Sequence, residues 1–162
     1  MRYTAHMSRV FPSLLGLIAA VAVVGAAVGQ PPSDPIVVKA IAEVEQSSKL
    51  VPAERVVSGD AVFYTLEVRN TAATTLPRPT VTYPVPEHMT YTPDSAVGPG
   101  TEVTYSVDAG RSFDTPENLK VQEPGGQVRA ATAVDYTHIR WQLKNALKGN
   151  SVAFVRFRAQ VK

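Results

Sequence analysis

Cysteine is absent from this sequence of 162 residues. Its absence excludes disulfides, zinc sites built on thiolates and a cysteine nucleophile. It also excludes a lipoprotein anchor, because the lipid of such an anchor is carried by a cysteine. A folded domain of this chain must therefore be stabilised by its apolar core alone, which a chain of this length can supply.

Histidine is scarce, with three residues in the chain, and only His88 and His138 lie beyond the first ten positions. No paired-histidine spacing, no Gly-x-Ser-x-Gly nucleophile motif and no loop rich in Asp and Asn is found. We therefore predict no catalytic, metal-binding or cofactor-binding residues. The alternative is an enzyme whose residues converge only in three dimensions, such as a pair of carboxylates in a hydrolase.

Long apolar runs are missing except near the N-terminus, where 15 residues from Leu14 to Val28 carry no polar side chain. Arg2 and Arg9 precede this run, which is typical of a secretory signal peptide. We predict a leader over residues 1–29 that directs the chain to the periplasm or the cell surface. An uncleaved anchor is the alternative, although a spanning helix needs about 20 apolar residues.

The leader ends in small residues and a polar break. Ala27 and Gly29 occupy the −3 and −1 positions of a cut before Gln30, as signal peptidases require. We predict cleavage near Gly29, with a cut after Ala27 as the alternative. Residues 30–35 are rich in proline and form a short tether.

Negative charge is missing from the C-terminal part of the chain, because Arg140–Lys162 contains six cations and no acid. Without the leader, the 16 basic residues fall to 14 and equal the 14 acidic ones. The exported chain is thus neutral overall, which argues against a nucleic-acid partner.

Period-two alternation of apolar residues predicts about seven strands separated by turns rich in Gly, Pro, Asn and Asp. The segments are Ile36–Val44, Val62–Val68, Val81–Val85, Met89–Thr92, Val103–Val107, Thr137–Leu143 and Ala153–Val161. Short strands spaced in this way indicate an all-β, immunoglobulin-like two-sheet sandwich over residues 36–162. Trp141 falls on an inward face, and Asn70 closes a strand where its side chain can bond nearby backbone.

Three segments resemble the bacterial conserved-repeat Ig-like domain (domain of unknown function 11). The first runs from the Gly59-Asp60 turn to Asn70-Thr71, the second is Pro86–Tyr91, and the third comprises Trp141–Leu143 and Ser151–Val161. The family usually has an Asp before a Leu-Pro pair where this chain has Tyr83–Pro86. The resemblance covers about Val38 to Val161, with an insertion around residues 100–134. It implies a sandwich domain of bacterial surface proteins, without a shared chemistry.

A second resemblance lies within the insertion, where Ser106–Phe113 is similar to an Asp-box hairpin with Ser112 and Phe113 in place of Thr and Trp. In families that carry this motif it is structural. We expect Asp108 to bond backbone amides of the turn and Gly110 to adopt a positive φ.

Outward cations near the C-terminus form the candidate partner-binding patch, namely Arg140, Arg156 and Arg158. We predict a monomer that binds an acidic envelope component through this patch, with membrane contact only if the leader stays uncleaved. The alternative is a solvated face that discourages pairing of sheet edges. The segments that begin at Ile36 and end at Lys162 are the expected edge strands.

These observations together predict an exported, non-catalytic cell-envelope protein, either structural or binding. The alternative is an envelope hydrolase whose site is assembled only in three dimensions.

Overall fold

A computed structural model describes residues 35–162, so the predicted leader and most of the predicted tether lie outside the described residues. The described part is all-β, with one 3₁₀ turn at Ala133–Asp135 and no α-helix, and it contains no helix suited to crossing a membrane. Its strands are β1 (Ile36–Gln46), β2 (Lys49–Pro52), β3 (Ala61–Asn70), β4 (Thr80–Pro84), β5 (Met89–Tyr91), β6 (Thr101–Ser106), β7 (Lys120–Gln122), β8 (Val128–Ala130), β9 (His138–Leu143) and β10 (Val152–Val161).

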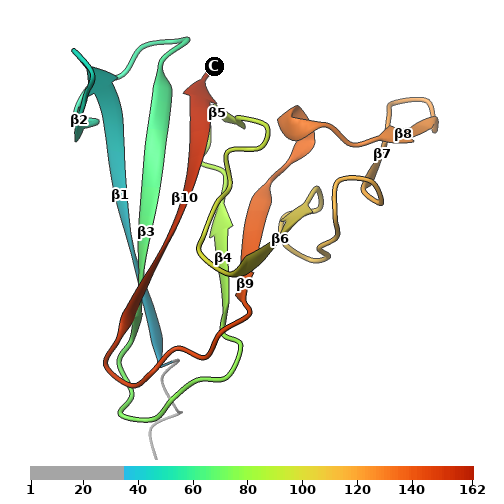
Figure 1. The fold of residues 1–162 in the computed structure, drawn as a ribbon. Coiled ribbons are helices and arrows are strands. Elements are labelled where there is room, and N and C mark those ends of the chain that lie inside the picture. Colours follow the sequence, from blue (N-terminus) through green and yellow to red (C-terminus); the bar gives the residue numbers. More distant parts are fainter. Residues whose placement is uncertain (1–34) are drawn as a thin grey trace, which may run out of the picture. The chain divides into compact units, whose positions relative to one another are not determined.

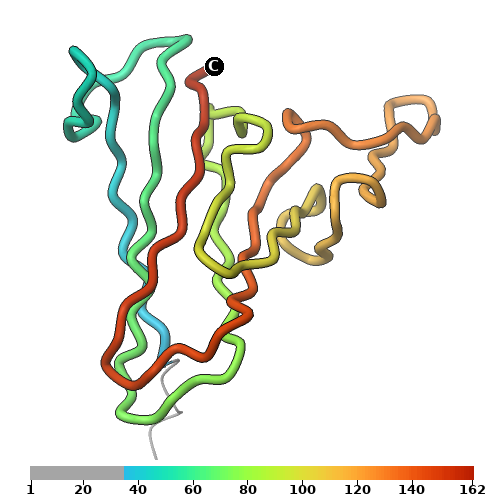
Figure 2. Tube along the Cα trace, in the orientation of Figure 1, coloured from blue at the N-terminus to red at the C-terminus, as the bar shows by residue number. Residues whose placement is uncertain are grey.

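Two antiparallel sheets make up the sandwich (Figure 1). The five-stranded sheet has the order β2-β1-β3-β10-β5, and the three-stranded sheet has the order β4-β9-β6. The β7–β8 ribbon forms a separate two-stranded sheet, and the chain trace shows it projecting away from the sandwich (Figure 2). The coarse prediction of an all-β sandwich is therefore confirmed.

The core lies between the inner faces of the two sheets. On β3 and β10, every second side chain is buried, which is the pattern that alternation predicted. Trp141 of β9 is fully buried, as expected, and its ring centroid lies 6.1 Å from that of Phe157 on β10. Phe157 also stacks on Tyr64 of β3 at 4.8 Å. The Trp141–Phe157 contact joins the two sheets, and the Tyr64–Phe157 stack joins neighbouring strands of the five-stranded sheet.

Asn70 ties together two loops at one end of the sandwich. The side chain is fully buried, and its amide group donates to the carbonyl oxygens of Thr74, Leu147 and Lys148 at 2.8–3.1 Å. Its Oδ1 accepts from the backbone N–H of Ala72 at 3.0 Å, as expected for a bond to nearby backbone. The end of β3 is thereby fixed to the connection between β9 and β10.

The same two loops approach so closely that only glycine fits at position 149. A Cβ atom there would lie 2.1 Å from the carbonyl oxygen of Ala73, which is backbone and cannot move cheaply. Gly149 therefore permits the contact that Asn70 holds.

The edge strands differ in part from the prediction. β10 lies between β3 and β5, so the expectation that the segment ending at Lys162 is an edge strand is wrong. Within residues 35–162, β1 pairs with β2 over Glu43–Gln46, and the earlier part Val37–Ile41 pairs with β3 alone. The segment that begins at Ile36 therefore lies at an edge over this part, as predicted.

Candidate binding face

The three predicted arginines do not lie on one face. Arg140 is on β9 of the three-stranded sheet, whereas Arg156 and Arg158 are on β10 of the five-stranded sheet. The inner faces of these sheets meet through Trp141 and Phe157, so the outward side chains point in opposite directions. The prediction of a single patch is wrong because the chain crosses from one sheet to the other between β9 and β10.

Arg140 is engaged by neighbouring side chains on the outer face of the three-stranded sheet. Its guanidinium carbon lies 3.5 Å from the centroid of the Phe113 ring, a cation–π contact. Its Nε donates to the Thr82 hydroxyl at 3.3 Å. The Phe113 ring therefore packs under a cation.

The turn at Ser106–Ser112 is closed by side-chain bonds. Asp108 Oδ1 accepts from the backbone N–H groups of Arg111 and Ser112 at 3.1 and 2.9 Å. The hydroxyls of Ser106 and Ser112 donate to the same carboxylate at 2.7 and 2.6 Å. The bonds from Ser112, and then that from Ser106, hold the pKa of Asp108 well below its usual range.

Gly110 has a φ of 82°, in the left-handed region. A Cβ there would lie 3.4 Å from the ring of His138, so the turn packs against the imidazole. His138 is half-buried, and its Nδ1 lies 3.2 Å from the Thr137 hydroxyl. Together these contacts give Asp108, Gly110 and His138 structural roles.

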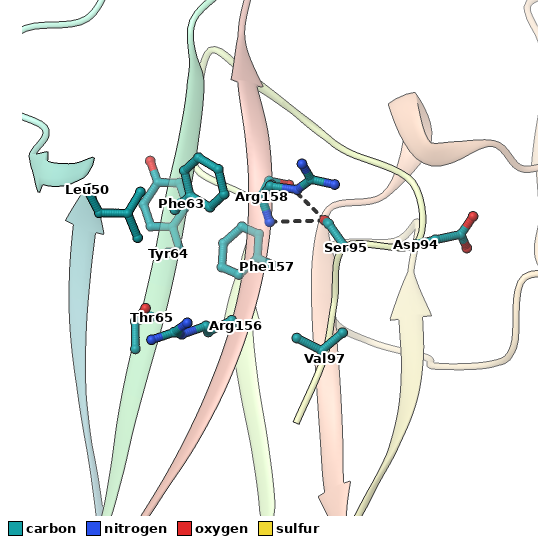
Figure 3. Close-up of a pocket in the computed structure, with 10 residues that line it drawn as sticks. All are labelled: Leu50, Phe63, Tyr64, Thr65, Asp94, Ser95, Val97, Arg156, Phe157 and Arg158. Carbon is teal, nitrogen blue, oxygen red and sulfur yellow. Dashed lines mark hydrogen bonds between the residues drawn. The ribbon is translucent and has the colours of Figure 1, made fainter. Parts of the chain in front are cut away.

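Arg156 and Arg158 line a groove on the outer face of the five-stranded sheet (Figure 3). The hollow has a volume of about 300 Å³. Pairing of β3 with β10 sets Thr65 opposite Arg156 and Phe63 opposite Arg158. The other lining residues are Leu50, Tyr64, Asp94, Ser95, Val97 and Phe157.

The two arginines of the groove have no carboxylate partner. Within residues 35–162, neither Arg156 nor Arg158 takes part in an ion pair. The guanidinium carbon of Arg158 lies 5.8 Å from the Phe63 ring centroid. Asp94 is at the rim, and its carboxylate points away from the groove (Figure 3). The groove therefore presents uncompensated positive charge beside apolar side chains.

The loop after β5 is held firmly against the groove. The backbone N–H of Arg158 donates to the Ser95 hydroxyl at 3.0 Å, and that hydroxyl donates to the carbonyl oxygen of Thr92 at 2.6 Å. Val97 and Arg156 exchange two backbone bonds at 2.8 Å. Ser95 and Val97, which line the groove on the side opposite Leu50, are thus held by hydrogen bonds to the backbone of β10.

The described residues offer no constellation for metal or acid–base chemistry near this groove. Within residues 35–162, no group of three His, Asp or Glu side chains could hold a metal ion. The one histidine–carboxylate pair found there, His88 with Glu87 at 4.0 Å, has both side chains more than four-fifths exposed. The two guanidinium groups of the groove can bind an anion.

A buried tyrosine cluster joins β5 to β6 away from the groove. The hydroxyls of Tyr91 and Tyr105 are 2.9 Å apart, and the Tyr136 ring stacks on Tyr105 at 4.4 Å. Burial, followed by the hydrogen bond from Tyr91, raises the pKa of Tyr105 above its usual range. The Tyr105 phenol therefore stays protonated near neutral pH, and the three rings pack together.

Sequence reasoning found the two arginines of the groove but missed its apolar walls. The available signal was Phe63, which occupies an outward position where a solvated sheet face usually carries polar residues. Leu50 and Val97 reach the groove from segments that no local pattern connects to β10.

Comparisons with protein-family models, with curated proteins and with solved structures gave no match.

Proposed function

We propose that this chain is an exported, non-catalytic envelope module of immunoglobulin-like type, similar to the bacterial conserved-repeat Ig-like domain. It acts as a monomer after its leader is cleaved near Gly29. Its role is to bind an acidic envelope component through the outer face of the five-stranded sheet, where Arg156 and Arg158 lie.

The groove is the observation that carries this proposal. Two guanidinium groups without carboxylate partners stand on adjacent outward positions of β10. Arginine and aromatic side chains are enriched where proteins bind partners, because they combine apolar area with directed hydrogen bonds. Arg140 is left out of the proposed face, since it lies on the other sheet and already contacts Phe113.

The alternative, an envelope hydrolase, has less support. A hydrolytic site would need two convergent carboxylates or a histidine beside a carboxylate in a cleft. The groove is lined by one carboxylate, that of Asp94, and it is directed outward (Figure 3). Neither His88 nor His138 lines it.

A capture experiment from envelope extract tests the binding claim. The wild-type chain should retain a partner that the double variant Arg156→Glu and Arg158→Glu loses, because the charge of the groove is reversed. Arg140→Glu is the matched control, which reverses one outward charge on the opposite sheet and should leave capture unchanged. Equal recovery by all three chains would show that the arginines form only a solvated face.

A further inference from the structure

The groove does not end at Arg156. A second hollow of about 460 Å³ is lined by Val97, Gly98, Pro99, Phe154 and Arg156. It shares Val97 and Arg156 with the first hollow. The two hollows thus adjoin along the outer face of β10, and Arg156 belongs to both.

The apolar side chains at both ends of this double groove are exposed. Leu50 is 41 % exposed at one end, and Val97 and Phe154 are 55 % and 51 % exposed toward the other. The small side chain of Thr65 lines the groove beside Arg156 (Figure 3). Exposed apolar groups that are grouped in this way mark a binding surface more often than scattered ones do.

The spacing of the two arginines restricts the ligand. They are two residues apart on one strand, so their Cα atoms are separated by about 6.6 Å at 3.3 Å per residue. Side chains on one side of any extended peptide have the same spacing. Two carboxylates at positions i and i+2 of such a peptide can therefore each meet one guanidinium, with apolar side chains at i−2 and i+4 at the levels of Phe154 and Gln160 of β10.

We propose that the partner at this face is an extended polypeptide segment in which two acidic residues alternate with other residues and are flanked by apolar ones. The inference rests on the proposed function and names the chemistry of its ligand. The pattern is apolar-x-acidic-x-acidic-x-apolar, with all four named side chains on the side that faces β10. A single small anion would leave one hollow and one arginine uncovered.

The acids near the groove agree with this placement. Glu67, opposite Phe154 on β3, is paired with Arg69 at 2.7 Å, and its charge is compensated. A further hollow beyond Phe63 and Arg158 is lined by Glu45 and Asp60 as well as Arg55. Its acids disfavour a carboxylate there, so the two acids of the segment are assigned to Arg156 and Arg158 and the residue beyond Arg158 is apolar.

Peptide titration of the isotope-labelled chain, recovered from the envelope, tests the inference by NMR. The probe is acetyl-Leu-Ser-Glu-Ser-Glu-Ser-Leu-amide. It should shift the amide signals of Val97, Arg156 and Arg158 in a saturable way. The matched control, acetyl-Leu-Ser-Glu-Glu-Ser-Ser-Leu-amide, has the same composition but points its two carboxylates to opposite sides. We expect it to bind at least about tenfold more weakly, the loss expected when one charge-assisted contact is missing.

Two variants separate the contributions of charge and apolar contact. Arg156→Gln should weaken the alternating peptide by about tenfold or more and remove its advantage over the control. Phe154→Ser should weaken both peptides alike, since it changes a hollow but not the arginine spacing. Unchanged amide spectra outside the groove show that each variant is folded.

Three results would overturn the inference. Equal affinity for the two peptides would mean that strand spacing is not recognised. Arginine-dependent binding of phosphatidylglycerol vesicles, without peptide binding, would identify a lipid surface in place of a polypeptide. If the chain binds neither peptide but still captures an envelope partner that depends on the arginines, this peptide pattern is rejected and the proposed function stays intact.

Discussion

Asp108 shows how one carboxylate can organise a turn. Four donors converge on it from Ser106, Arg111 and Ser112, and these bonds lower its pKa. A depressed pKa in the folded state means that the carboxylate contributes stability above its unfolded pKa, about 3.9. This contribution is lost as the pH falls below that value toward the folded pKa.

Asp108→Asn should therefore be less stable than wild type at neutral pH, and its stability should fall less between pH 5 and pH 2.5. The measurement is the unfolding free energy by urea titration across this range, with the difference between the two chains plotted against pH. Asp135 is also held by hydrogen bonds that lower its pKa and contributes equally to both profiles. Parallel profiles would show that the charge of Asp108 has no part in the turn.

At the scale of single residues, local sequence patterns were enough to predict the hydrogen bonds of Asp108. All four donors to Asp108 lie within Ser106–Phe113, so the role of Asp108 could be predicted without a fold. The bond that Asn70 Oδ1 accepts from the backbone N–H of Ala72 is equally local. The bonds that the Asn70 amide donates to Leu147 and Lys148 span more than 75 residues. The latter bonds depend on topology, which no short pattern encodes.

At the scale of elements, the two loops joined by Asn70 act as a clasp between β3 and the β9–β10 connection. Asn70→Ala removes four hydrogen bonds and leaves the Thr74 carbonyl and the Ala72 N–H without this partner, whereas the carbonyls of Leu147 and Lys148 keep bonds from Leu76 and Ser151. We expect a loss of roughly 2–4 kcal/mol in the free energy of unfolding, from several lost bonds and the burial of unpaired groups.

Chemical denaturation of the two chains measures this loss. Asn118→Ala is the matched control, because Asn118 is exposed and makes one side-chain bond, to Asp114 at 3.0 Å. That variant should change the stability by less than about 0.5 kcal/mol, as is usual for surface positions. A loss for Asn70→Ala as small as that of the control would contradict the clasp.

Seven strands followed from alternation because each carries its own inward row of apolar residues. β2 was missed because its turn is Ser47-Ser48, with φ values of 52° and 63°. Such turns usually contain Asn and Gly, so a pair of serines gives no signal. β7 and β8 were missed since each has three residues and little burial, which leaves no alternation to detect.

The whole molecule presents two different outer faces. The three-stranded sheet carries the Arg140–Phe113 contact and the Asp108 turn, whereas the five-stranded sheet carries the double groove. Which strands share a sheet decides which cations share a face. Arg140 lies 16 residues before Arg156 in the sequence. A sandwich commonly changes sheets between consecutive strands, so separation along the chain does not predict whether the two side chains share a face. The candidate face could therefore be predicted only in part.

Our proposal requires export of this chain, since an acidic envelope partner can be reached only if the folded domain lies outside the cytoplasm. Its most direct test is the intact mass of the native chain in each fraction of fractionated cells. We predict that the chain is found in the periplasmic or surface fraction, with the mass of a polypeptide that begins at Gln30 or at Val28. Recovery of the full-length chain in the cytoplasm would contradict it.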